Sequence, residues 1–205
     1  MEEILRAAER LVVRDGVDAL TTRAVATAAR VPVASVYQYF ADRDGIMAAL
    51  IERHVLAMDA QLTAEVTALE TFSVRTLVQA TVAAYVAGYR QRPSYVIIWF
   101  QGRVSPEIAT FVRRRSEDLA TRFHAFSIAA GLVRPETGVL VFELAAEMID
   151  AFLAVAYRDD LGGDERIIDE GIEMIASYIA PHATPAGLDG VPAAEIAGRL
   201  EIGTT

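Results

Sequence analysis

Residues 21–43 read TTRAVATAARVPVASVYQYFADR, and this stretch predicts two short helices joined by a tight turn, followed by the start of a third. Thr21 is placed to cap the first helix, because its hydroxyl can accept a free backbone N–H of the first turn. Pro32 forces the residue before it out of helical geometry, so the second helix begins there and runs to about Phe40. Asp42 is expected to cap the third helix. This pattern is typical of a helix-turn-helix that binds duplex DNA.

The second helix carries Ser35, Tyr37 and Tyr39, a small polar and aromatic surface with no obvious place in a core. Two tyrosines two positions apart on a short helix cannot share one buried face, so at least one is expected to be partly exposed. Val36 and Phe40, four positions apart, are expected to point inward. The tyrosines therefore have two interpretations, contact with DNA or packing at the surface.

Helical periodicity extends over most of the chain, which predicts an all-α protein. The first helix is expected from about Glu2 to Arg14, with Gly16 ending it. The helix after Asp42 continues to about residue 66. Further helices are predicted, between breaks rich in Gly and Pro, at about 72–91, 94–102, 106–130, 136–158 and 164–180.

The composition indicates a folded, rather apolar chain, since 53% of the 205 residues are hydrophobic and the mean hydropathy is +0.30. The absence of cysteine excludes disulfide frameworks, zinc–thiolate sites and thiol catalysis. The most apolar long segment, residues 138–157, contains Glu143, Glu147 and Asp150, which argues against a membrane span. The Met-Glu-Glu start lacks the features of a signal peptide, so we expect a cytoplasmic protein.

The net charge of −9 argues against nucleic-acid binding unless the charges are unevenly distributed. Residues 1–48 hold six arginines and seven acids, a net of −1, which leaves −8 for the rest of the chain. Affinity for DNA depends on cations placed at phosphates rather than on the sum over the whole protein. The acidity weakens the prediction of DNA binding without removing it.

A run of residues in the first quarter of the chain recurs at the spacing of a known family: Ile4, Leu5, Ala7, Ala8, Gly16, Thr21, Thr22, Val25, Ala26, Val31, Tyr37, Tyr39, Phe40 and Arg43. With these residues the segment resembles the TetR family of bacterial transcriptional repressors. The resemblance implies a DNA-binding domain at 1–48 and a helical domain for effector binding and dimerisation at 49–182. Residues 183–205 are then expected to form a flexible tail, with one short helix near 193–200.

By this resemblance, eight side chains are expected at the DNA: Thr22, Arg23, Val33, Ala34, Ser35, Tyr37, Tyr39 and Arg43. The N-terminal end of the second helix enters the major groove in such units, so Val33 and Ala34 offer apolar contact and Ser35 a hydrogen bond. Arg23 lies beside the DNA backbone and can also reach a base edge. The tyrosine hydroxyls and Arg43 are expected to bond phosphate oxygens.

The turn between the two helices departs from the family pattern. The family commonly has Gly where this chain has Arg30, at a position that favours a left-handed backbone. A residue with a Cβ costs on the order of 1 kcal/mol in that conformation. Pro32 stands where a capping Ser is usual, so one hydroxyl that could bond a phosphate is missing.

The resemblance also implies a homodimer held by the helices at about 136–158 and 164–180, packed as a four-helix bundle. The sequence supports this pairing independently, because the first of these helices is apolar nearly all round. A symmetric dimer presents two recognition helices about one DNA turn apart, ~34–36 Å, which predicts a palindromic operator.

The equivalent domain of the family holds a mostly apolar pocket for a small molecule. Seven side chains are candidates to line it here: Tyr85, Tyr89, Trp99, Phe100, Phe123, Phe126 and Glu147. The alternative is that the aromatic residues simply fill a core, as aromatic stripes mainly do. Glu147 belongs to an acidic stripe with Glu143 and Asp150, which would face solvent, pair with an arginine or recognise a cationic ligand.

Three hypotheses follow from these patterns. The first is a dimeric repressor released from its operator by a small, mostly apolar ligand, and the second is a DNA-binding regulator without such an effector. The third is a small helical enzyme, but no nucleophile elbow, phosphate loop or paired-acid pattern supports it. His54, His124 and His182 match no metal-ligand spacing, so we expect no metal and no cofactor.

Overall fold

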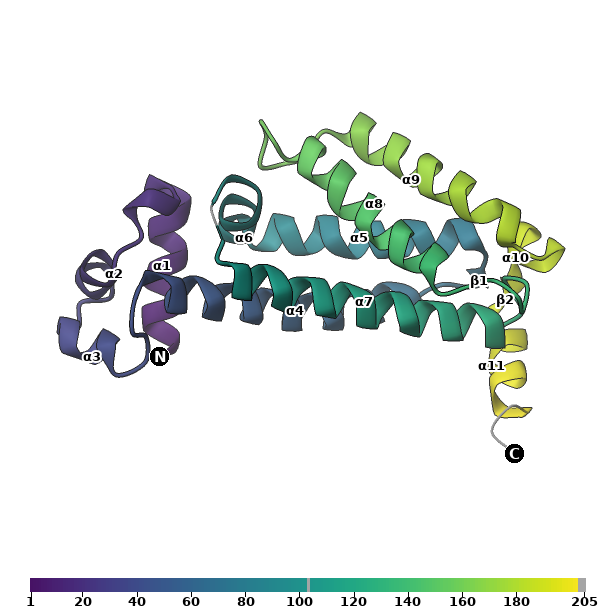
Figure 1. Cartoon of the computed structure of the whole chain (residues 1–205), viewed down its shortest axis with the longest axis horizontal. Coiled ribbons are helices and arrows are strands. Elements are labelled where there is room, and N and C mark those ends of the chain that lie inside the picture. The colour runs from purple at the N-terminus through teal and green to yellow at the C-terminus, as the bar shows by residue number, and fades with distance from the viewer. Residues whose placement is uncertain (103, 203–205) are drawn as a thin grey trace.

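The computed structural model describes residues 1–102 and 104–202 and, within them, all side chains except those of residues 101 and 199–202. The described chain folds into a small N-terminal domain and a larger helical bundle, and one long helix, α4, passes from the first into the second (Figure 1). The N-terminus and the last described residues lie at opposite ends of the molecule. Apart from one short two-stranded ribbon, the described secondary structure is helical, so the all-α prediction is confirmed.

The N-terminal domain is closed by the first turns of α4 and contains α1 (Glu2–Asp15), a 3-10 turn η1 (Val17–Ala19), α2 (Thr22–Ala29), α3 (Val33–Tyr37) and α4 itself (Arg43–Thr67). The predicted caps are confirmed. Thr21 accepts the N–H of Ala24 at 3.1 Å, and Asp42 accepts the N–H of Gly45 at 2.8 Å. Gly16 ends α1 with φ of 81°, a backbone conformation that glycine adopts without strain.

Helix α3 is shorter than predicted and ends at Tyr37 rather than near Phe40. The N–H groups of Tyr39 and Phe40 both bond the carbonyl of Val36 at 3.0 Å, which tightens the chain after the helix. The tightened turn carries Phe40 into the core beside Val36, where both are buried as predicted. Tyr37 and Tyr39 are left outside.

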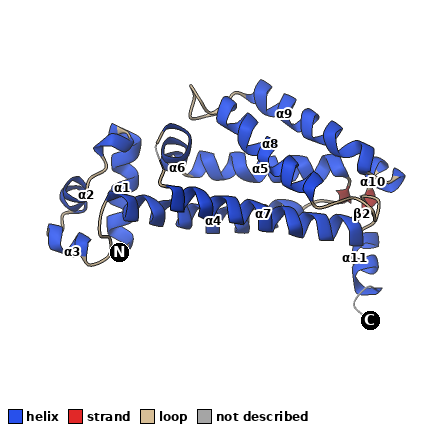
Figure 2. Ribbon diagram, in the orientation of Figure 1, coloured by secondary structure: helices blue, strands red, loops and turns tan. Residues whose placement is uncertain are grey.

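The larger domain is built from α4 together with α5 (Val74–Gln91), α6 (Pro93–Val96), a π-helical turn η2 (Ile97–Gln101), α7 (Pro106–Ala129), α8 (Leu140–Ala156) and α9 (Glu165–Ile179). Helix α5 packs against α4 and α9, and α8 packs against α7 and α9 (Figure 2). The predicted helix at 136–158 starts only at Leu140, because Thr137 donates its N–H to the carbonyl of Arg134 at 2.9 Å in a turn. The helix predicted at 94–102 divides into α6 and η2.

Residues 183–202, expected to form a flexible tail with one short helix near 193–200, are packed in the described structure, and the short helix is present. This segment follows a 3-10 turn η3 (Ala180–His182) and forms α10 (Pro185–Asp189), β2 (Val191–Pro192) and α11 (Ala193–Ile202). Strand β2 pairs antiparallel with β1 (Thr71–Phe72), while Val191 and Ile196 are buried in a cluster with Phe72. The Pro, Gly and Ala content predicted a loose chain, but a few apolar side chains suffice to dock it. Residues 203–205 of the predicted tail lie outside the described residues.

Candidate DNA-binding surface and ligand cavity

The end of α3 presents two aromatic side chains to solvent. Tyr37 and Tyr39 are 54% and 53% exposed, so both are available to a partner. The hydroxyl of Thr22 donates to the hydroxyl of Tyr37 at 3.2 Å, which ties the start of α2 to the end of α3. Ala34 is exposed near the start of α3 and Ser35 is half-buried beside it. The predicted contact residues of α2 and α3 therefore lie on one accessible unit.

Two arginines stand at the ends of α2. Arg23 and Arg30 are exposed, and neither forms an ion pair within the part of the chain that the structure describes. Arg30 has φ of 56° and ψ of 40°, the left-handed backbone expected at this turn. Its charge makes it a further candidate for a phosphate contact, which the sequence argument missed by treating it only as a turn residue. Gln38, exposed between the two tyrosines, was missed in the same way.

Arg43 has a partner inside the protein. One of its terminal nitrogens, Nη2, donates to the carbonyl of Val17 at 3.1 Å and lies 3.8 Å from the carboxylate of Asp18. The side chain therefore fastens the start of α4 to the η1 turn between α1 and α2. Its predicted contact with a phosphate remains a prediction, and it would have to be made by the part of the guanidinium that stays exposed.

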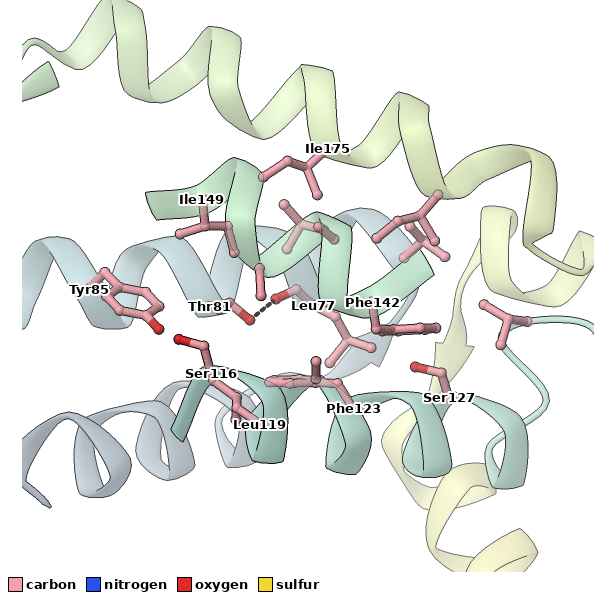
Figure 3. A pocket seen from close by; sticks show the side chains of 17 residues that line it. Leu77, Thr81, Tyr85, Ser116, Leu119, Phe123, Ser127, Phe142, Ile149 and Ile175 are labelled. Carbon is pink, nitrogen blue, oxygen red and sulfur yellow. Dashed lines mark hydrogen bonds between the residues drawn. The ribbon is translucent and has the colours of Figure 1, made fainter. Parts of the chain in front are cut away.

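The larger domain encloses a cavity of about 70 Å³ between α5, α7, α8 and α9 (Figure 3). Most of its wall is apolar, with Leu77, Phe123, Phe142, Ile149 and Ile175 among the lining side chains. A few hydroxyl groups interrupt this wall: those of Thr81, Tyr85, Ser116 and Ser127. The hydroxyl of Thr81 is already satisfied by the carbonyl of Leu77 at 2.8 Å. Such a wall suits an apolar ligand.

The structure brings two of the seven predicted lining residues, Tyr85 and Phe123, to this cavity. Phe126 lies outside it and packs on Phe72, with ring centroids 5.6 Å apart. Tyr89 is one turn nearer α6 than Tyr85 and is fully buried among other aromatic rings. It belongs to the core, which was the alternative interpretation of the aromatic pattern.

The remaining three predicted residues also lie elsewhere. Trp99 and Phe100 sit on η2 and are partly buried against the main core. Glu147 is exposed on α8, because the inner face of this helix runs through Ala145 and Ile149. None of the three lines the cavity.

A second cavity of about 50 Å³ adjoins the first, and Tyr85, Ser116 and Leu119 line both. Five titratable residues of its wall were not among the predicted site residues: His54, Asp59, Tyr95, Arg115 and Asp150. His54 could have been noticed, because it lies one helical turn from both Leu50 and Met58 on the apolar face of α4. Asp150 was recognised only as part of the acidic stripe.

No metal site is found among the residues that the structure describes, since no three His, Cys, Asp or Glu side chains come together there. His124 instead bonds the carbonyl of Thr137 through Nε2 at 2.8 Å. The described helices also include none with the length and apolar character needed to cross a membrane.

An accessible helix-turn-helix joined by a long helix to a helical bundle defines a class of DNA-binding regulators. Residues 4–50 match the family described as bacterial regulatory proteins, tetR family, and residues 73–183 match the tetracyclin repressor-like C-terminal domain. The chain belongs to the TetR family. It is a DNA-binding transcriptional regulator and not an enzyme.

Individual relatives agree with this assignment. A TetR-family transcriptional regulator from Streptomyces coelicolor is 29% identical, with a TM-score of 0.69 over 88% of this chain and 98% of that one. An uncharacterised HTH-type transcriptional regulator of Mycobacterium tuberculosis is 27% identical over 90% of this chain and 86% of its own length. SmeT, the repressor of the Stenotrophomonas maltophilia multidrug efflux pump SmeDEF, is 20% identical and shares the fold, with a TM-score of 0.64 over 94% and 93% of the two chains.

Proposed function

We propose that this regulator is a cytoplasmic, homodimeric repressor that binds a palindromic operator and is released by a small, mostly apolar ligand. The observation that carries the proposal is the separation of two sites along one helix. Helix α4 begins in the helix-turn-helix at Arg43 and reaches the second cavity at His54 and Met58. A ligand that enlarges the cavity would displace α4 and, with it, the DNA-binding domain.

The proposed DNA contacts divide by chemistry. Ser35 and Arg23 are the polar groups for reading base edges, while Val33 and Ala34 can meet only apolar groups such as a thymine methyl. Tyr37, Tyr39 and Arg43 would hold the phosphate backbone and fix the register. With so few polar groups for base reading, much of the affinity would come from backbone contacts and depend strongly on salt.

The proposed dimer would form through α8 and α9. Leu140, Leu144 and Val155 recur on the outer face of α8 and are 60%, 45% and 43% exposed, and Met174 on α9 is 44% exposed. Glu147 lies on the same face by its spacing, so the stripe is mostly apolar, and a monomer would leave its leucine and methionine side chains in water. A second copy of the same stripe would cover it around a twofold axis.

The test is a binding titration of the purified protein with the DNA upstream of its own coding region. We expect a retarded complex at one palindromic sequence, with an affinity that falls steeply as salt rises. A folded dimer that binds no sequence in that region in a salt-dependent way would contradict the proposal.

A regulator without a small-molecule effector is the second candidate, and the size of the cavities favours it. Together they enclose far less than the roughly 300 Å³ that sites for drug-sized ligands require, so a ligand must displace side chains to enter. Thermal-shift screening against apolar metabolites and drugs separates the two candidates. A stabilising ligand that also releases DNA supports the first, and no stabilising ligand in a broad panel supports the second.

A further inference from the structure

The two cavities differ in chemistry. We call the one lined by Leu77, Phe142 and Ile175 the apolar chamber, and the one lined by His54 and Asp150 the polar chamber. Tyr85, Ser116 and Leu119 form the partition between them. Figure 3 shows the hydroxyls of Tyr85 and Ser116 pointing toward each other across this partition. A ligand that displaced these three side chains would place its apolar body in the apolar chamber and a polar group in the polar chamber.

His54 is a polar group in the polar chamber without a partner. It is 2% exposed, and neither ring nitrogen has a hydrogen-bond partner. Its ring is stacked on Tyr95, with centroids 3.6 Å apart, and this contact fixes the plane of the ring. Burial, with a smaller contribution from Arg92, lowers the pKa of His54 to about 3. The ring is therefore neutral near pH 7 and offers one donor and one acceptor.

Asp150 supplies a negative charge to the same chamber. Its carboxylate has no hydrogen bond or ion pair among the residues that the structure describes. Burial and the nearby charge of Glu147 raise its pKa to about 6, so it is mostly ionised near pH 7. A carboxylate in such surroundings gains most from a positively charged partner.

The other charges around the polar chamber do not supply that partner. Arg115 is paired with Asp59 and lies near Asp118, so this group carries no net positive charge toward the chamber. Arg92 contributes positive potential at His54, but its side chain lines the outer groove beside α1 instead of the chamber. An anionic ligand would be repelled by Asp150, and the arginine of the chamber wall, Arg115, is already paired and does not compensate for this repulsion.

We propose that the polar chamber binds the protonated basic nitrogen of an amphiphilic amine, whose apolar body occupies the apolar chamber. The ammonium pairs with the carboxylate of Asp150 and donates to the free acceptor nitrogen of His54. The ring of Tyr85 lines the same chamber and can turn its face toward the cation. The inference rests on the proposed ligand-responsive function and adds the chemical class of the effector to it.

The test uses three probes of one shape, phenylbutylamine, phenylbutanol and phenylbutanoate, titrated into the full-length protein by calorimetry. Emission of Trp99, the single tryptophan, gives a second readout, because this ring stacks on Tyr95 with centroids 6.2 Å apart. We expect the amine to bind about tenfold or more tightly than the alcohol, and the carboxylate to bind most weakly. In Asp150→Asn the amine should lose this advantage while the affinity for the alcohol stays within about twofold. Asp169→Asn, which makes the same change at an exposed carboxylate of α9, is the control that should keep the preference for the amine.

The outcomes separate the inference from the function on which it rests. Equal or tighter binding of the alcohol or the carboxylate would overturn the amine preference and leave a ligand-responsive regulator standing. An amine preference that survives in Asp150→Asn would remove Asp150 from the site and overturn the inference. Binding of none of the three probes to the wild-type protein would count against both. If Asp150→Asn does not fold, the ranking of the three head groups on the wild-type protein decides the inference alone.

Discussion

At the scale of single residues, the hydroxyls of Tyr37 and Tyr39 can be removed without touching the core. Tyr39→Phe is expected to weaken DNA binding about fivefold to tenfold, because a hydrogen bond to a phosphate contributes about 1 kcal/mol. Tyr37→Phe should weaken it further, since it also removes the acceptor of the Thr22 hydroxyl. Fluorescence anisotropy with operator DNA measures both. Thr121→Val, which removes an exposed hydroxyl from α7, is the control, and unchanged affinity in both tyrosine variants would exclude them from the interface.

His54 makes the folded state sensitive to acid. Its pKa is lowered from 6.5 to about 3, so the unfolded chain takes up a proton in this range that the folded chain rejects. The stability that the neutral ring provides is complete above pH 6.5 and is lost as the pH falls toward 3. By this linkage the loss reaches about 2 kcal/mol at pH 5.

His54→Phe keeps an aromatic ring on Tyr95 and removes the titrating group. The variant should lose about 2 kcal/mol less of its free energy of unfolding than the wild type does between about pH 7.5 and pH 5. Urea denaturation at the two pH values measures this difference. Equal losses of unfolding free energy in the wild type and the variant would show that His54 titrates normally in the folded state.

Single residues were predictable from the sequence where their role is local. Thr21 and Asp42 act as caps through the backbone of the next three residues, and the left-handed backbone at Arg30 is what the family resemblance implies for this turn. The polar chamber was not predictable in this way. Helix α8 is apolar nearly all round, so its sequence pattern does not show which of its acidic residues faces inward. The sequence therefore predicted Glu147 at the ligand site, whereas Asp150 is the residue that lines a cavity.

At the scale of elements, the C-terminal segment depends on one close contact. A Cβ at Gly187 in α10 would lie 1.8 Å from the carbonyl oxygen of Leu132, and backbone atoms cannot yield easily. Gly187→Ala should therefore destabilise the protein by about 1–3 kcal/mol, as overpacking does. A Cβ at Gly198 in α11 would have no neighbouring atom within 4 Å, so Gly198→Ala is the matched control. Thermal unfolding compares the two, and equal melting temperatures would mean that α10 does not dock at Leu132.

The apolar stripe on α8 and α9 gives a second prediction at this scale. Leu144→Glu places a charge at the centre of the proposed dimer contact, twice by symmetry, and should convert the dimer to a monomer at micromolar concentration. Leu188→Glu changes a leucine of similar exposure on α10, outside the stripe, and should leave the dimer intact. Sedimentation velocity distinguishes the two states. A dimer that persists in Leu144→Glu would move the interface elsewhere.

Long elements were predicted better than their ends or their docking. The capped α4 and the periodic α7 lie where the sequence placed them, because many residues contribute to each pattern. The end of α3 depends on Phe40 reaching the core, which is a tertiary contact. The docking of residues 183–202 depends on Val191 meeting Phe72, a contact between distant parts of the chain that no local pattern records.

At the scale of the whole molecule, the distribution of charge and the elongated shape both keep the acidic bundle apart from the DNA-binding domain. Residues 1–48 carry −1 of the total of −9, so the strongly acidic part of the chain is the bundle. The DNA-binding domain lies at one end of the molecule, with the bundle extending away from it (Figure 1). This separation keeps the acidic surface away from the phosphates while α4 connects the cavity with the DNA-binding unit.

The measurement that tests the central claim most directly is the dependence of DNA affinity on the spacing of the two half-sites. A symmetric dimer presents two recognition helices on one side of the duplex, about one helical turn apart. An insertion of about 5 base pairs between the half-sites turns one of them to the opposite side, and we expect affinity to fall to the level of unrelated DNA. Affinity that is unchanged by the insertion would show that the two half-sites are not read by one rigid dimer.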